Sequence, residues 1–94
     1  MVSVGVLRID FCVSGSSSLK EKRMVLRRLK DRVRNTFNVS VAEVGHNDKW
    51  QLSSFALACV SNEKKHIDAT LNKIRDFFED ERRISITDYT MEII

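Results

Sequence analysis

The chain begins with a two-residue hydrophobic period and then changes to a helical one. Residues 2–14 alternate apolar and polar side chains, which predicts a strand with one face on a core. Residues 18–37 instead carry apolar side chains at helical spacing. Ser18 and Glu21 open this second segment in the Ser-x-x-Glu pattern of a capping box. We therefore expect a strand, a turn at residues 15–17 and a helix that ends near residues 35–37.

The same two patterns return in the second half of the chain. Residues 39–44 and 50–60 read as strands joined by a hairpin turn, because Gly, His, Asn and Asp lie between them. Ser61 and Asn62 are suitable caps for a second helix, whose apolar side chains recur at helical spacing. A polar break follows, and residues 84–94 alternate as a last strand.

The order strand, helix, strand, strand, helix, strand predicts an α+β fold, the ferredoxin-like βαββαβ sandwich. We expect a four-stranded antiparallel sheet in the order 4-1-3-2 with both helices on one face. A chain of 94 residues suits one domain, spanning residues 1–94.

Composition and cysteine usage narrow the function classes. Hydrophobic residues make up 43% and charged residues 31% of the chain, as in ordinary globular domains. Cys12 and Cys59 lie in separate strand-like segments, so we expect buried thiols and neither a disulfide nor a zinc site. We find no signal peptide and no membrane-spanning segment, and expect a cytoplasmic protein that does not bind membranes.

Charge is concentrated in one segment. Residues 19–34 hold eight basic and two acidic side chains, whereas the whole chain has a formal net charge of only +3. The rest of the chain is therefore net negative, and this polarity favours a polyanionic partner. We find no nucleophile elbow, no metal-ligand spacing and no paired catalytic acids. We thus expect no enzyme activity, no metal, no other cofactor and no small-molecule substrate.

Helical projection divides the basic residues into two groups. Five of them fall within an arc of about 80° beside the apolar stripe and form a line along one flank of the helix. These five, the basic ridge, are Lys20, Arg23, Arg27, Lys30 and Arg34. Arg28 and Arg32 point away from the core, where solvation alone accounts for them. A line of charge matches a phosphate backbone, and the arginine fork grips a phosphate with two donors.

The start of the helix is unusually basic. Lys20, Lys22 and Arg23 lie where the helix dipole is already positive, which costs about 0.3–1 kcal/mol per cation. Lys22 even falls within the apolar arc. Unpaired backbone N–H groups and the hydroxyls of Ser16, Ser17 and Ser18 lie at the same end. We therefore predict an anion-binding site there, with Lys22 as a further phosphate contact.

Other interpretations stay open beside nucleic-acid binding. A charged helix face is often only solvated, and a basic helix can also bind an acidic protein surface. The third strand lacks the aromatic pattern of an RNA recognition motif, and no Gly-x-x-Gly loop of a KH domain is present. RNA should therefore contact the basic helix. Trp50 could stack on a base, but a lone Trp at a strand start more often packs over a core edge or an interface.

Four segments of the chain carry a resemblance to a known family: residues 18–23 (Ser-Leu-Lys-Glu-Lys-Arg), 37–44 (Phe-Asn-Val-Ser-Val-Ala-Glu-Val), 48–51 (Asp-Lys-Trp-Gln) and 60–62 (Val-Ser-Asn). In this order and spacing they resemble the YlxP-like family of small bacterial proteins. The resemblance implies a ferredoxin-like fold. It also implies a role near ribosome maturation or translation, because genes of this family commonly neighbour those of translation initiation factor two and ribosome-binding factor A. The family has no established catalytic residues to carry over.

Together these features predict a non-enzymatic protein that binds RNA or a ribosomal particle through its first helix. The predicted phosphate contacts are Lys20, Lys22, Arg23, Arg27, Lys30 and Arg34. The alternative is an interaction module that forms a homodimer, through a sheet edge or the Trp50 region. The apolar residues Val4 and Val6 on an open sheet face suggest it.

Overall fold

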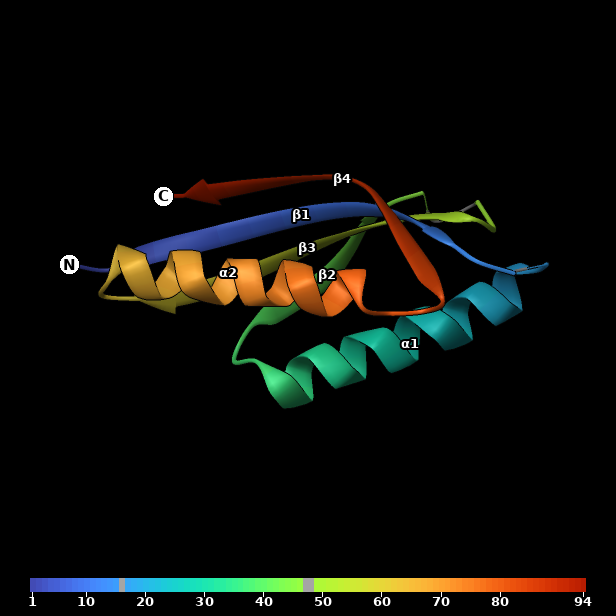
Figure 1. Ribbon diagram of the computed structural model, residues 1–94, viewed down its shortest axis with the longest axis horizontal. Helices are drawn as coiled ribbons and strands as arrows, with labels where there is room; N and C mark the ends of the chain where they lie inside the picture. Colours follow the sequence, from blue (N-terminus) through green and yellow to red (C-terminus); the bar gives the residue numbers. More distant parts are fainter. Residues whose placement is uncertain (16, 47–48) are drawn as a thin grey trace.

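A computed structural model of the chain, shown in Figure 1, describes residues 1–15, 17–46 and 49–94. Its elements are β1 (Ser3–Val13), α1 (Leu19–Thr36), β2 (Ser40–Gly45), β3 (Leu52–Ser61), α2 (Lys64–Glu79) and β4 (Ile84–Ile93). Neighbouring strands are antiparallel in the order β2-β3-β1-β4, which is the predicted order counted from the other edge. The predicted α+β, ferredoxin-like βαββαβ fold is confirmed.

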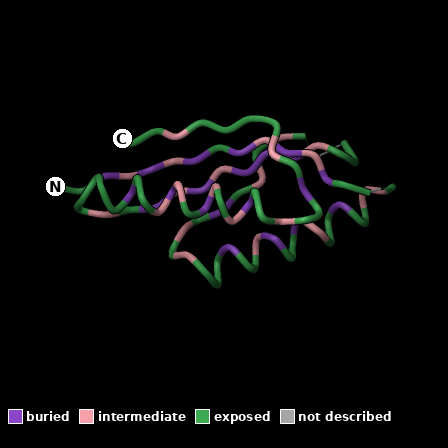
Figure 2. The backbone as a smooth tube through the Cα atoms, viewed as in Figure 1, coloured by how far each residue is buried: buried purple, intermediate pink, exposed green. Residues whose placement is uncertain are grey.

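The first strand lies in the interior of the sheet, where it pairs with β3 on one side and β4 on the other. Its odd-numbered residues, such as Leu7 and Ile9, are fully buried under the two helices, which lie on the same side of the sheet (Figure 1). Its even-numbered residues, such as Arg8 and Asp10, face the opposite side. One hydrophobic core draws residues from all six elements (Figure 2). The helices therefore cover one face of the sheet, and the other face stays open.

Helix α1 begins as the capping pattern predicts. The Ser18 side chain accepts a hydrogen bond from the Glu21 backbone N–H at 3.2 Å. The helix ends at Thr36, after which the Phe37 N–H donates to the Val33 carbonyl at 2.8 Å. Its buried stripe contains Leu26, Leu29, Val33 and, unexpectedly for a charged residue, Lys22.

Helix α2 packs closely on the sheet because the facing strand residue is a glycine. A Cβ atom on Gly5 would lie only 2.1 Å from Ile67 Cγ2. The apolar stripe of the helix, which ends at Phe78, is buried as its spacing predicts. The expected cap was wrong, since Glu63 occupies the N-cap position and Ser61 Oγ accepts a hydrogen bond from the Glu63 N–H.

The last strand contains a β-bulge that its sequence pattern does not reveal. Ile86 pairs with Phe11, but Asp88 pairs with Asp10, so Thr87 is an extra residue between them. Strict alternation placed Ile86 and Tyr89 on different faces, and this expectation was wrong. The bulge turns both toward the helix-covered face, opposite Phe11 and Ile9.

Candidate nucleic-acid interface

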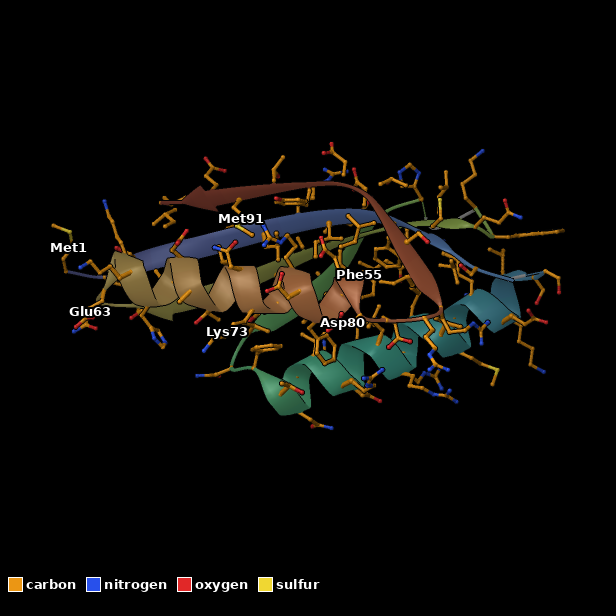
Figure 3. All side chains as sticks on the ribbon, viewed as in Figure 1. Met1, Phe55, Glu63, Lys73, Asp80 and Met91 are labelled. Atoms are coloured by element: carbon orange, nitrogen blue, oxygen red, sulfur yellow. The ribbon has the colours of Figure 1, made fainter. Side chains whose placement is uncertain are left out.

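The basic ridge lies along one flank of α1, as the helical projection predicts. Its members follow one another at alternating spacings of three and four residues, which keeps them on one side of a helix. Lys20, Arg23, Arg27 and Arg34 are exposed, and Lys30 is half-buried. In Figure 3, nitrogen-tipped side chains project from α1 away from the sheet. The ridge spans about 21 Å at 1.5 Å per residue, which is long enough to contact several successive phosphates of a nucleic-acid strand.

The electrostatic state of the ridge favours an external anion. Within the described part of the chain, no ion pair joins Lys20, Arg23, Arg27 or Lys30 to a carboxylate. At the far end, Arg34 Nη2 donates a hydrogen bond to the Val41 carbonyl of β2 at 3.3 Å. That bond directs this end of the ridge toward the edge of the sheet, while the charge of the guanidinium stays exposed.

Lys22 occupies a different place from the one predicted. Its side chain is 1% exposed, and Nζ donates to the His46 carbonyl at 2.5 Å and to the Lys49 carbonyl at 2.6 Å. A buried ammonium requires such partners, because an unpaired charge in the core is costly. Lys22 therefore holds the hairpin between β2 and β3 against α1 and is not part of the exposed ridge. The position of Lys22 inside the apolar arc of the helical projection was the feature of the sequence that indicated its burial.

Part of the predicted anion site at the helix start is already engaged by contacts within the chain. The Glu21 carboxylate accepts from the Ser17 N–H at 3.2 Å and from Ser17 Oγ at 3.1 Å, and Ser18 Oγ caps the helix. Glu21 thus places a negative charge where an external anion would have to bind. In this structure Ser17 donates to Glu21 and Ser18 caps the helix, and Ser16 lies outside the described residues. The Ser-x-x-Glu pattern predicted the Ser18 cap but not the two bonds from Ser17 to Glu21.

The opposite flank of α1 carries basic residues that the sequence interpretation set aside or missed. Arg28 and Arg83 line a hollow of about 320 Å³, together with the carboxylate-bearing Glu21. Arg32 pairs with Glu81 and lies 5.1 Å from the centre of the Phe77 ring. Mixed charge on this flank makes it a weaker phosphate surface than the ridge. Arg83 is distant from Arg28 in the sequence, and the tertiary fold brings the two residues to the same hollow.

Trp50 lies at the surface, just before the start of β3. Its side chain is 53% exposed, and it lines a hollow of about 400 Å³ with Lys49, Gln51 and Leu52. It therefore does not belong to the core of this chain.

A small polar cluster lies on the open face of the sheet. Asp10 Oδ1 accepts from Ser54 Oγ at 2.6 Å and from Arg8 Nε at 3.3 Å, and the latter contact is also an ion pair. The Ser54 hydrogen bond is the main reason that the pKa of Asp10 lies below its ordinary value, with Arg8 and the nearby His46 acting in the same direction. Asp10 is accordingly a carboxylate at neutral pH.

Both cysteines are free thiols, Cys59 buried and Cys12 half-buried. Burial raises the pKa of Cys59. In the described ranges, no group of three or more His, Cys, Asp or Glu side chains is arranged to hold a metal ion. No described helix combines the length and the apolar character needed to cross a membrane.

Comparison with known proteins identifies relatives of unknown activity. Residues 4–91 match the family described as "Protein of unknown function (DUF503)". The chain is 40% identical over 90 residues to the "Uncharacterized protein YlxP" of Bacillus subtilis (strain 168). That match covers 92% of this chain and 98% of the relative. Both findings confirm the YlxP-like resemblance that the four sequence segments indicated.

Proposed function

We propose that this chain, which belongs to the DUF503 family of proteins of unknown function, is an RNA-binding accessory protein. In this proposal it associates with ribosomal particles in the cytoplasm. It contacts the phosphate backbone and catalyses no reaction. The phosphate contacts are the five members of the basic ridge: Lys20, Arg23, Arg27, Lys30 and Arg34. Lys22 is left out because it is buried against the hairpin.

The observation that carries the proposal is the linear arrangement of the ridge. Its charges extend for about four helical turns and face outward, and none of its five members has an ion pair in the described parts of the chain. A line of cations over about 21 Å matches the repeating phosphate charges of a nucleic-acid strand. Arginine supplies three of the five positions, and its planar fork suits phosphate oxygens.

Charge-reversal variants test this proposal. The triple variant Arg23→Glu, Arg27→Glu and Lys30→Glu inverts the middle of the ridge without changing the core. We expect its affinity for a fluorescently labelled ribosomal RNA fragment to fall at least 100-fold at 50 mM salt, measured by anisotropy.

The matched control reverses the same number of charges on the other helix. Lys64→Glu, Lys65→Glu and Lys73→Glu alter exposed lysines of α2 and change the net charge by the same amount. We expect this variant to keep most of the wild-type affinity, within about tenfold. Equal losses in the two variants would show that net charge alone governs binding. No loss in the ridge variant would refute the proposed contact.

Association with the ribosome requires a separate measurement. We expect the wild-type protein to sediment with ribosomal particles at low salt and to be released at high salt, since phosphate contacts weaken as salt rises. The triple ridge variant should stay in the supernatant at both salt concentrations. Failure of the wild-type protein to sediment at low salt, with RNA binding intact, would exclude ribosomal particles as the partner.

A second candidate is the homodimer, for which the open sheet face provides a specific observation. Val60 is 67% exposed there and lies opposite Val4 of β1. Ala58 lies between Val6 and Ser40 near the middle of this face. Light scattering of the wild type and of Ala58→Glu tests this idea. A dimer that the substitution dissociates would support it, and a wild-type monomer at high concentration would exclude it.

A further inference from the structure

The hairpin between β2 and β3 is held beside the first turns of α1. Lys22 Nζ binds the His46 carbonyl and the Lys49 carbonyl, one from each side of the turn. Figure 1 shows this hairpin and the start of α1 at the same end of the molecule. Lys20 and Arg23, where the ridge begins, flank Lys22 in the sequence. The segment that follows Lys49 is therefore fixed close to the start of the ridge.

The side chain that this segment presents is Trp50. Its indole is 53% exposed beside the hollow of about 400 Å³, where Lys49 supplies a cation and Gln51 an amide. Tyr89 is the other exposed aromatic residue among those described, but Arg75 covers its ring at 5.2 Å and donates to its hydroxyl at 3.0 Å. Trp50 is thus the aromatic side chain available for an external ligand.

We propose that Trp50 stacks on an unpaired base of the RNA strand whose phosphates follow the basic ridge. This inference rests on the proposed function, and it specifies single-stranded RNA as the ligand class. Stacking on an aromatic side chain requires a base that is not already stacked on its neighbours within a duplex. Lys49 can contact the phosphate next to that base, and the Gln51 amide can reach its edge. The open hollow provides the space for one ring.

Intrinsic fluorescence gives a direct readout, because Trp50 is the only tryptophan of the chain. We would titrate the full chain with a 12-nucleotide oligouridylate, the corresponding duplex with oligoadenylate, and inorganic polyphosphate. The single strand should quench the indole and bind more tightly than the duplex. Polyphosphate, which has charge but no base, should bind the ridge and leave the fluorescence unchanged.

Two substitutions separate stacking from charge. Trp50→Ala should lower the affinity for oligouridylate by roughly 10- to 100-fold and leave the affinity for polyphosphate unchanged. Trp50→Phe should retain most of the affinity, since it keeps an aromatic face. Val60→Ala removes exposed apolar surface on the open face of the sheet and should change neither the affinity for oligouridylate nor that for polyphosphate. Circular dichroism checks that each variant is folded.

The outcomes distinguish this inference from the proposal on which it rests. Unquenched binding of oligouridylate, with Trp50→Ala at wild-type affinity, would overturn the stacking contact and leave ridge binding intact. Equal affinity for the single strand and the duplex would likewise overturn the stacking contact and leave ridge binding intact. If neither RNA nor polyphosphate binds the wild-type protein, the proposed function itself fails, and the stacking contact with it.

Discussion

Replacing the buried Lys22 provides a sharp test of how the helix and the hairpin are joined. Lys22→Met keeps most of the apolar stem and removes the ammonium that binds the His46 and Lys49 carbonyls. Lys22→Ala removes the stem as well. The control is Lys20→Met, two residues away in the same helix, because Lys20 is exposed and has no ion pair in the described ranges.

The expected loss of stability follows from the two contacts. A hydrogen bond from a charged group contributes about 1.5–3 kcal/mol, and the desolvation of the buried ammonium opposes part of that gain. We therefore expect Lys22→Met to lower the free energy of unfolding by about 1–3 kcal/mol. Lys22→Ala also removes three buried methylene groups at about 0.8 kcal/mol each, which brings its total to about 3–5 kcal/mol.

Urea unfolding followed by circular dichroism measures these differences. For a domain of this size, each kcal/mol corresponds to a shift in Tm of about 4–8 °C, so thermal unfolding is a second readout. Lys20→Met should stay within about 0.5 kcal/mol of the wild type. If Lys22→Met and Lys20→Met are equally stable, the two short hydrogen bonds contribute nothing and the reasoning is refuted.

The same variant distinguishes the structural role of Lys22 from the phosphate contact predicted by sequence. A lysine that neutralises a phosphate contributes about 0.7 to the slope of log affinity against log salt for a single strand. Lys22→Met should leave that slope unchanged, whereas Lys20→Met should reduce it. A reduced slope in Lys22→Met would mean that its ammonium reaches the RNA.

Three further substitutions test β1, the turn that follows it and the open face of the sheet. Gly5→Ala should destabilise the protein by about 1–3 kcal/mol in urea unfolding, because the new Cβ would meet Ile67 at 2.1 Å. Gly15→Ala should cost about 1–2 kcal/mol through its φ of +69°. Among the described residues, and apart from its chain neighbours, no atom lies within 4 Å of the added Cβ, so the backbone conformation alone accounts for the cost. A neutral Gly5→Ala or a neutral Gly15→Ala would contradict the reason given for it. Ser54→Ala should raise the pKa of Asp10 toward its ordinary value of 3.8, measured by NMR titration, because it removes the main hydrogen bond that lowers it. Because the folded state lowers the pKa of Asp10, its contribution to stability is present above pH 3.8 and is lost as the pH falls through the folded-state pKa. If the stability of the wild type shows no such loss in acid relative to Ser54→Ala, the proposed role of the Ser54 hydrogen bond is contradicted.

The fold was predictable because the hydrophobic periods are unambiguous. The alternation in β1 and the helical stripes of α1 and α2 each indicate one structure, and the element order then leaves few topologies. The bulge at Thr87 was not predictable, because a bulge depends on how two strands pair, and the alternation continues through it in the sequence. The N-cap of α2 is Glu63 and not Ser61 or Asn62. Several polar residues precede this helix, and the sequence pattern does not show which of them occupies the cap position.

The candidate site was only partly predictable. The flank of the helix that carries the ridge follows from 3.6 residues per turn, so its position needed no tertiary information. The role of Lys22 could not be predicted without tertiary information, because the carbonyls that bind its ammonium come from residues 24 and 27 positions later in the chain. The exposure of Trp50 and the approach of Arg83 to Arg28 likewise depend on contacts between distant segments.

The salt dependence of RNA binding tests the central claim most directly. For the wild-type protein and a labelled single-stranded RNA, five phosphate contacts predict a slope of about −3.5 in log affinity against log salt, or about a 100-fold loss between 50 and 200 mM. Reversing Arg23, Arg27 and Lys30 should bring the slope to −1.5 or shallower, while the α2 control keeps the wild-type value. A flat wild-type slope, or a ridge variant with the wild-type slope, would contradict the account.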